Sequence, residues 1–559
     1  MDLFALTSVF LIGTAVFVPV DYLLSCIFHS ILWGTVITLI LFSIGAIRFR
    51  KKFKRITLDW SSGLLLFFAL TFSTWMMFKT FHGGLNGELY VGSNNVFDFG
   101  HSLGIVRSFS WGSNLPMMSP FESGLPFFYH FFFYFWVAVL EYVGLPIVWA
   151  MNIPSILSFT ALLIVIYYLP QKLAKQKPLV GWVAVLLTIT NSSLTFWMLL
   201  PKLSSLWQLQ TYPFAGPFDG STISIFVTLN NFVNQRHLAF AIAFALFLYM
   251  SAFRSKILLG VLTGVLMLWN SVIYVFTVAA FSVRFALKKE WNSLIIYATI
   301  ALISGGIWLV PIAGFLVKSI LFLRSVTSGI TDAHVGNIAG YLWQNLGILP
   351  LVAGIGFFVV PKKTRDVWIP FIFLFFLACV LASRGGFEQK TYSFFIIGIN
   401  VLAAIGLAWI WKKVNIVAVL LLFVLTVSGF VDLMPIKNEF AYPLIGNDTV
   451  AVISWIKSST PKNAVFVSYS DMIDPVVLAG RTNYFGFFGN VGWYDRSPVV
   501  AKIYSGDMDL AKKSDISYIL IPKWNKPDFF YQVDITRLAR LNQKVYEDKN
   551  YIIFHVSSP

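Results

Sequence analysis

Charged residues are scarce in this chain of 559 residues: Asp, Glu, Lys and Arg make up 12% of it, whereas hydrophobic residues make up 57%. Only two cysteines occur, Cys26 and Cys379, far apart and each in an apolar stretch, which argues against a disulfide framework and a thiolate metal site. The phosphate-binding patterns GxGxxG and GxxxxGK[ST] are missing, as are the zinc spacings HExxH and HxxxH. Long apolar runs dominate instead, so the composition excludes a soluble fold and indicates a polytopic membrane protein.

Acidic residues are fewer than basic ones, 25 against 41, and the formal net charge is +16. The basic residues fall mostly in short loops between apolar runs, where they set topology and meet anionic lipid headgroups. The predicted partner of this positive charge is therefore the membrane and not nucleic acid. The first apolar run has no basic segment before it and no A-x-A-like site after it, so we expect it to remain as a membrane helix.

Thirteen apolar runs predict membrane-spanning helices. The basic segment RFRKKFKR at 48–55 places the N-terminus on the cytoplasmic side. A further apolar stretch at 127–143 is predicted to be re-entrant or interfacial, because a full crossing would put most basic loops outside. The predicted spans are 3–20, 27–47, 60–80, 147–169, 179–200, 237–253, 257–270, 272–286, 293–316, 343–360, 367–383, 392–411 and 414–432. The short pair at 257–286, with Asn270 and Ser271 at its tip, is predicted to be a hairpin that reaches only part way.

The composition changes to mixed polar sequence after Leu433, which divides the chain into a transmembrane part, 1–433, and a soluble domain, 434–559. An odd number of spans puts the domain outside the cell membrane. Asn447 or Asp448 is a candidate helix cap, and strands are expected at 464–468, 516–521 and 551–556, with a helix at 535–543. This pattern predicts an α/β unit.

One polar segment, residues 94–130, stands out within the apolar sequence and occupies the long outer loop 81–146. Asp98 and His101 lie one turn apart on what reads as a short helix, and apolar residues from Phe97 to Phe109 are expected to face a membrane surface. Pro116 and Pro120 end that helix before a second, aromatic-rich helix begins. A polar loop of this length between membrane segments is usually functional.

The stretches FDFGHSLGIVRSFSWGSNLP and FESGLPFFYH, followed later by NQRHLAF, resemble the GT-C superfamily of membrane glycosyltransferases, near its protein O-mannosyltransferase-like branch. The resemblance implies an α-helical polytopic fold of about 13 transmembrane helices with an extracytoplasmic C-terminal α/β domain. It also implies transfer of a sugar from a polyprenyl-phosphate donor to a hydroxyl acceptor of a protein, lipid or glycan on the outer face. Transfer inverts the anomeric centre with one base. Metal dependence varies in that superfamily, so a divalent metal stays open, and no nucleotide cofactor is expected.

Asp98 is the predicted general base, since transfer to a hydroxyl requires a carboxylate that takes the acceptor proton. The competing interpretation is a helix cap. His101 is placed beside it in the catalytic set. Glu122 either assists the base, binds a metal or is a solvated turn residue. Asp219, in TYPFAGPFDGSTIS, is a candidate second acidic site, although its Gly and Pro neighbours favour a turn.

Candidate ligands of the donor phosphate come from several segments. Arg236 and His237 in NQRHLAF begin a span at the outer boundary, where a topogenic anchor is the competing interpretation. Arg481, in LAGRTNYFG, is the expected contact from the C-terminal domain. The predicted phosphate-binding set is Arg107, His130, Arg236, His237 and Lys390.

Two other classes of function fit a chain of thirteen spans. A transporter or channel would often show two repeated halves with broken helices at matching positions, and no such symmetry is seen. A non-catalytic lipid-binding protein stays open. The sequence does not specify the sugar or the acceptor.

Overall fold

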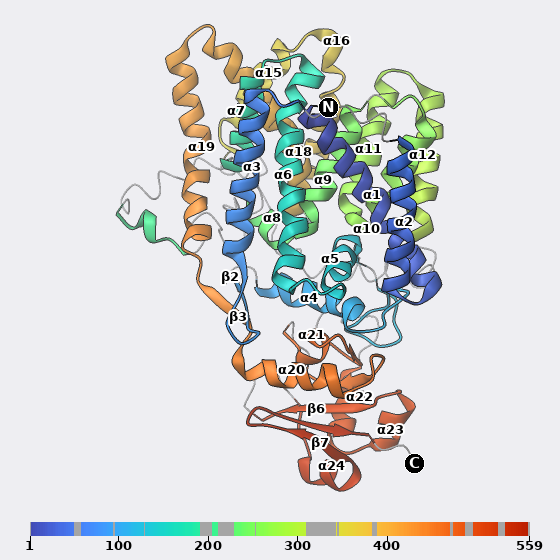
Figure 1. The fold of residues 1–559 in the computed structure, drawn as a ribbon. Coiled ribbons are helices and arrows are strands. Elements are labelled where there is room, and N and C mark those ends of the chain that lie inside the picture. The colour runs from blue at the N-terminus through green and yellow to red at the C-terminus, as the bar shows by residue number, and fades with distance from the viewer. Residues whose placement is uncertain are drawn as a thin grey trace.

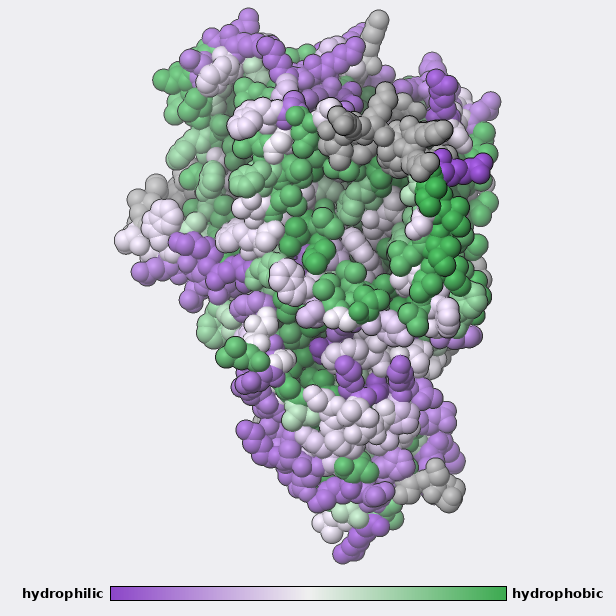
Figure 2. Space-filling view, viewed as in Figure 1, coloured by the Kyte–Doolittle hydropathy of each residue, from purple (hydrophilic) through white to green (hydrophobic). Residues whose placement is uncertain are grey.

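The structure is a computed structural model of the chain, and it describes residues 2–49, 57–92, 96–127, 129–190, 204–210, 229–251, 253–308, 343, 346–382, 388–469, 473–486, 496–523 and 531–556. A bundle of apolar helices forms one part, and a small domain with a β-sheet forms the other (Figure 1). The N-terminus and the C-terminal domain lie at opposite ends of the bundle (Figure 1). In the view of hydropathy, apolar residues cover the bundle and hydrophilic ones cover the small domain (Figure 2).

Within the described residues, an apolar helix lies in each of the thirteen predicted spans, although parts of some spans, such as 191–200 and 309–316, lie outside those residues. Among the helices that the structure describes, six are long and apolar enough to cross a membrane: α1, α2, α3, α6, α18 and α19. A helix satisfies its own backbone hydrogen bonds, which lipid cannot do, so apolar runs of this length fold as helices. The chain is thus a multi-pass membrane protein. The thirteen are α1 (Leu3–Phe28), α2 (Ile31–Phe49), α3 (Trp60–Thr80), α6 (Ile147–Ala174), α7 (Pro178–Thr190), α9 (Arg236–Met250), α10 (Lys256–Trp269), α11 (Ser271–Leu287), α12 (Trp291–Gly306), α15 (Leu349–Val359), α17 (Ile369–Ala382), α18 (Glu388–Trp411) and α19 (Asn415–Lys437).

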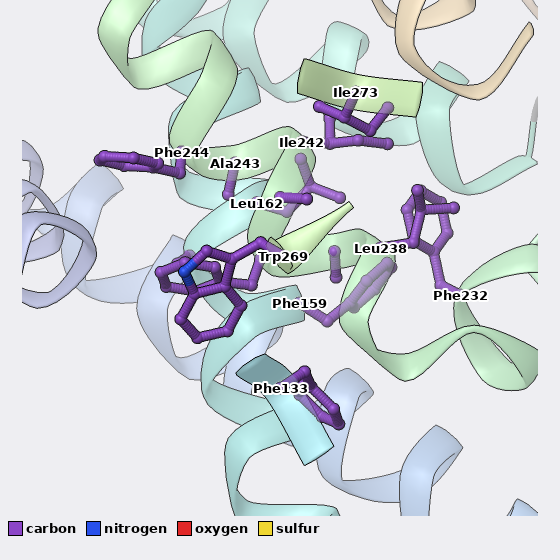
Figure 3. Close-up of a cluster of buried hydrophobic side chains, with 14 of the residues drawn as sticks. Phe133, Phe159, Leu162, Phe232, Leu238, Ile242, Ala243, Phe244, Trp269 and Ile273 are labelled. Carbon is purple, nitrogen blue, oxygen red and sulfur yellow. The ribbon is translucent and has the colours of Figure 1, made fainter. Parts of the chain in front are cut away.

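The predicted hairpin of α10 and α11 ends inside the bundle. Asn270 joins the two helices, and its side chain accepts a hydrogen bond of 3.0 Å from the backbone N–H of Ile273, which caps α11. Trp269, beside it, is fully buried, and its ring lies 3.9 Å from that of Phe240 in α9. Figure 3 shows Trp269 within a cluster of buried apolar side chains that includes Phe133. The tip is therefore anchored in the protein core.

Two short helices follow α3 at the end of the bundle that carries the C-terminal domain. Helix α4 (Val96–Ser110) lies across this end, and α5 (Phe132–Tyr142) lies just above it (Figure 1). With 11 residues, α5 is about 16 Å long, well short of the roughly 30 Å hydrocarbon core of a bilayer. The chain then starts α6 at the same end, so α5 does not cross the bundle (Figure 1). The expectation that this stretch is re-entrant or interfacial stays a prediction.

A three-stranded antiparallel sheet connects the two parts of the chain. Its strands are β1 (Phe81–Gly83), β2 (Leu89–Gly92) and β3 (Ala441–Ile445), in the order β1-β2-β3. Strand β3 follows α19 directly and pairs with β2, so that Ala441 lies opposite Gly92. This pairing brings the end of the last membrane helix to the start of α4.

The C-terminal domain is an α/β unit, as predicted. Its sheet has the order β5-β4-β6-β8-β7, with β4 parallel to β5 and β6. The expected strands appear near 464–468, 516–521 and 551–556, whereas β7 replaces the end of the expected helix at 535–543. The strands are β4 (Val465–Val467), β5 (Thr482–Asn483), β6 (Tyr518–Pro522), β7 (Gln543–Glu547) and β8 (Tyr551–His555), and the helices are α20 (Asn447–Ser459), α21 (Pro475–Leu478), α22 (Ser497–Tyr504), α23 (Met508–Lys513) and α24 (Ile535–Leu541).

The predicted cap of α20 is wrong. Gly446 is the N-cap residue and provides no side-chain hydrogen bond, while Asn447 and Asp448 are already helical. Asp448 lies in the first turn, where its charge interacts favourably with the helix dipole.

Close packing of α15 on α18 yields a prediction about stability. A Cβ atom added at Gly356 would lie 1.9 Å from the backbone oxygen of Leu402, whereas one added at Gly354 would meet nothing within 4 Å. We expect Gly356→Ala to separate the two helices and cost about 1–3 kcal/mol, and Gly354→Ala to have little effect. Thermal unfolding of the purified protein in detergent measures this, and equal melting temperatures for the two variants would contradict it.

A second prediction concerns topology. Ser113, after α4, and Ser505, in the C-terminal domain, are both exposed. Lys412 is exposed in the turn between α18 and α19. This turn and the C-terminal domain lie at opposite ends of the molecule (Figure 1). In a background with Cys26 and Cys379 replaced by Ser, single cysteines at 113 and 505 should react with an impermeant thiol reagent in intact cells. A cysteine at 412 should react only after permeabilisation. Labelling of 113 and 412 from the same side would refute the arrangement.

Candidate functional site

Helix α4 lies between the bundle and the C-terminal domain. Leu103, Ile105, Val106 and Phe109 are buried in protein contacts, so the expectation that they face a membrane surface is wrong. The side chain of Phe97, which shared that expectation, lies outside the described residues. A Cβ atom added at Gly104 would lie 2.5 Å from Val477 of α21, which shows how closely the domain packs on this helix.

Asp98 lies in the first turn of α4 and is partly buried. The helix already begins at Val96, so Asp98 is a first-turn residue and not the N-cap. Burial and the neighbouring Tyr134 raise the pKa of Tyr129 well above its usual value, and the negative charge of Asp98 adds to this effect. The carboxylate of Asp98 therefore lies close to a pair of tyrosines. A negative charge in the first turn is stabilised by the positive end of the helix dipole.

His101, one turn further along α4, is 3% exposed. Its ring stacks on Phe121 at 5.1 Å between centroids and meets the edge of Tyr129 at 4.8 Å. Burial lowers the pKa of His101 to about 3, so the ring is neutral at pH 7. His101 thus connects the Asp98 turn to the loop that carries Glu122.

Two further predicted residues join this cluster from distant segments. His130 precedes α5, and His237 lies in the first turn of α9. Their ring centroids are 4.1 Å apart. The hydroxyl of Tyr134, on α5, lies 3.0 Å from Nδ1 of His237 and accepts a hydrogen bond of 3.1 Å from Ser102 of α4. Asp98, His101, His130 and His237 are therefore assembled around Tyr129 and Tyr134, and we call this set the polar cluster.

Arg236 is next to the polar cluster but is bound by the protein itself. It is 2% exposed, and all five of its N–H groups are directed at protein acceptors. Its Nε donates to the backbone oxygen of Val233 at 2.8 Å, and Nη2 donates to Thr80 at 2.8 Å and to the backbone oxygen of Met77 at 3.3 Å. Nη1 donates to Asn152 and to the sulfur of Met77. These bonds fix the start of α9 against α3 and α6.

Arg107 lies at the other end of α4, about 13 Å along the helix from Asp98. Its Nε is 3.6 Å from the carboxylate of Glu141, and its Nη1 donates to the backbone oxygen of Leu478 in the C-terminal domain at 2.8 Å. The guanidinium also lies 3.9 Å from the ring centroid of Trp111. The structure does not bring Arg107 into the polar cluster.

Arg481, in the C-terminal domain, donates mostly to backbone oxygens. One of them belongs to Trp111, directly after α4. Nη1 donates to Trp111 at 3.1 Å and to Ala479 at 3.2 Å, and Nη2 donates to Lys457 at 2.7 Å and to Thr460 at 2.9 Å. Nε donates to the Thr460 hydroxyl. With all five N–H groups engaged, Arg481 joins the domain to the end of α4.

Glu122 lies where the loop after α4 meets the domain. The loop pairs with β5, since the N–H of Asn483 donates to Pro120 and the N–H of Ser123 donates to Asn483. Glu122 is 2% exposed, and in the part of the chain that the structure describes its Oε1 has no hydrogen-bond partner. Burial raises the pKa of Glu122 to about 7, against the opposing effect of the positive charge of Arg496. This carboxyl group is therefore buried and is not a solvated turn residue.

The remaining predicted residues lie beyond what the structure describes. Asp219 falls in residues 211–228, which are outside the described residues, and the Lys390 side chain is also outside, although its backbone lies in the first turn of α18. Within the described ranges, no three His, Cys, Asp or Glu side chains are grouped as ligands of a metal ion.

Sequence reasoning missed Tyr134, Ser102 and Glu439. Glu439 follows α19, is 8% exposed, and lies against Gly92 and within electrostatic range of Arg236. Its position directly after the last span could have identified it as an acid at the outer boundary. Tyr134 and Ser102 have no such signal, because Tyr134 lies in an aromatic run and Ser102 is one serine among several.

No protein-family model and no curated protein matches the chain in sequence. Among solved structures, the arabinofuranosyltransferase AftD from Mycobacteria is similar over 88% of this chain, with a TM-score of 0.50 and 11% identity. ArnT from Cupriavidus metallidurans, solved with undecaprenyl phosphate, is similar over 89% of this chain and 98% of its own, with a TM-score of 0.46 and 13% identity. For AglB, an oligosaccharyltransferase from Archaeoglobus fulgidus, the shares are 83% and 70%, the TM-score 0.40 and the identity 11%.

This chain spans 40% of the length of AftD, so the similarity concerns a part of that protein. At 11% identity the similarity shows a shared architecture and no more. The chain has the GT-C fold of polytopic membrane glycosyltransferases, together with a small C-terminal sheet domain.

Proposed function

We propose that this chain is a membrane glycosyltransferase that moves a sugar from a polyprenyl-phosphate donor to a hydroxyl acceptor, with Asp98 as the general base. The observation that carries the proposal is the polar cluster itself. It brings Asp98, His130 and His237 together from three separate segments at one end of the bundle, beside the C-terminal domain. A carboxyl group beside histidine and tyrosine side chains at the end of a membrane bundle suits transfer from a lipid-linked donor.

In the proposed reaction, the acceptor hydroxyl attacks the anomeric carbon while its proton passes to the carboxylate of Asp98. The bond between that carbon and the phosphate oxygen breaks, and the polyprenyl phosphate leaves with the electron pair, so the anomeric centre is inverted. Hydrogen bonds from His130 and His237 would stabilise the phosphate charge as it develops. The start of α9, with His237 in its first turn, adds the positive end of a helix dipole.

The other predicted residues take supporting roles in this proposal. Arg236 positions His237 by fixing the start of α9, and Arg107 and Arg481 hold the C-terminal domain on α4. Glu122 would contact the acceptor side, because His101 and Phe121 connect it to the polar cluster. Lys390 and Asp219 stay proposals from sequence, as a phosphate contact and a second acidic site. The reaction would take place on the outer face, with the N-terminus cytoplasmic.

The first test is Asp98→Asn. The amide removes the basicity and keeps the shape, so transfer should fall by about 10²- to 10⁴-fold. Folding should change little, because a first-turn charge contributes only about 0.3–1 kcal/mol. Mass spectrometry of glycans and glycolipids from cells with the wild type, the variant or no chain measures transfer. Binding of undecaprenyl phosphate to the purified variant serves as the control for folding.

Products that depend on the chain should be absent from cells that carry Asp98→Asn. If those products reach wild-type levels, Asp98 is not the base, and the base has to be sought at Glu122, Glu439 or Asp219.

Glu122 yields a prediction about pH. Its folded pKa, about 7, lies above the ordinary value of 4.5, so the folded chain holds the proton more tightly than the unfolded chain does. The resulting stabilisation is fully present below pH 4.5 and is lost as the pH rises through 7. Glu122→Gln should therefore match the wild type near pH 5 and exceed it by about 1–3 kcal/mol at pH 8.

Thermal unfolding of both proteins at the two pH values measures this difference. A stability difference that is the same at pH 5 and pH 8 would show that Glu122 does not titrate in the folded chain.

A further inference from the structure

The hydroxyl of Tyr134 is the centre of a hydrogen-bond network among residues of three segments. Tyr134 is 1% exposed and lies in the first turn of helix α5. Its oxygen accepts a hydrogen bond from Ser102 of α4 and lies 3.0 Å from Nδ1 of His237 in α9.

Two hydrogen bonds define the role of the Tyr134 hydroxyl. Ser102 donates to its oxygen, and the single proton of Tyr134 is directed at Nδ1 of His237, 3.0 Å away.

A histidine that accepts at Nδ1 carries its own proton at Nε2. The reverse assignment, with a proton on Nδ1, would give the Tyr134 oxygen a second donor and take away the acceptor of its own proton. It would thus leave a buried hydroxyl proton unsatisfied, which costs free energy.

We infer that Tyr134 is a positioning residue that holds His237 as the neutral tautomer protonated at Nε2. This inference rests on the proposed function, in which His237 is a hydrogen-bond donor to the phosphate of the polyprenyl carrier. A fixed Nε2–H group is a donor of defined position in a site closed off from water, and its bond strengthens as the departing phosphate gains charge. Tyr134 itself does not touch the phosphate and acts only through His237.

The test reads the tautomer directly in the full chain, labelled with [¹⁵N]histidine and reconstituted in lipid. The signals lost in His237→Gln assign His237 by NMR. In the wild type we expect Nδ1 without a proton and Nε2 with one, and in Tyr134→Phe a mixture of both tautomers. Ser102→Ala is the matched control: it removes one donor to Tyr134 but leaves the bond from Tyr134 to His237, so the tautomer should not change. A proton on Nδ1 in the wild type, or an unchanged tautomer in Tyr134→Phe, overturns the inference.

Binding of undecaprenyl phosphate to the same proteins separates this inference from the proposed function. Tyr134→Phe should weaken binding about twofold if the two tautomers are equally populated, because the apparent dissociation constant rises in inverse proportion to the fraction of molecules that carry the Nε2 proton. In the His237→Gln background, whose amide has no tautomers, Tyr134→Phe should leave binding unchanged. An equal loss in both backgrounds would mean that Tyr134 is merely structural and overturns the inference. The expected tautomers together with unchanged binding in every variant support the inference and contradict the phosphate role of His237.

Discussion

The packing of this structure depends on one constraint: each buried guanidinium group needs acceptors for its five N–H groups. Arg236 and Arg481 are both nearly fully buried, and each directs five N–H groups at protein acceptors. A buried charge is tolerated only when such partners are in place, because removing one acceptor leaves a buried N–H group without a hydrogen bond. Arg236 therefore fixes α9 against α3 and α6, and Arg481 fixes the C-terminal domain against the end of α4.

The position of α4 in turn creates the polar cluster. The helix lies between the bundle and the C-terminal domain (Figure 1). A buried polar side chain needs a protein partner, and the tyrosines and histidines around α5 and α9 provide such partners.

The antiparallel sheet β1-β2-β3 closes the same region from the side. It joins the segment after α3 to the segment after α19, which lie about 350 residues apart in sequence. This pairing places Glu439 against Gly92, just before α4, and within electrostatic range of Arg236. The region around Asp98 thus depends on both ends of the membrane part as well as on the C-terminal domain.

The sequence by itself determined the membrane helices, the short helix α5 that does not cross the bundle and the α/β character of the C-terminal domain, because apolar length and the distribution of basic loops are local properties of the chain. It also pointed to Asp98, His101, His130 and His237, which the structure assembles. Only the tertiary structure decided the partners of the arginines. Arg107, Arg236 and Arg481 look alike in sequence as cations near an outer boundary. An arginine that is buried and bound to backbone oxygens has a structural role, and the sequence does not distinguish it from one that is free to bind a ligand. The roles of Tyr134 and Ser102 were equally invisible, since a hydrogen bond between side chains 32 residues apart depends on how α4 and α5 pack.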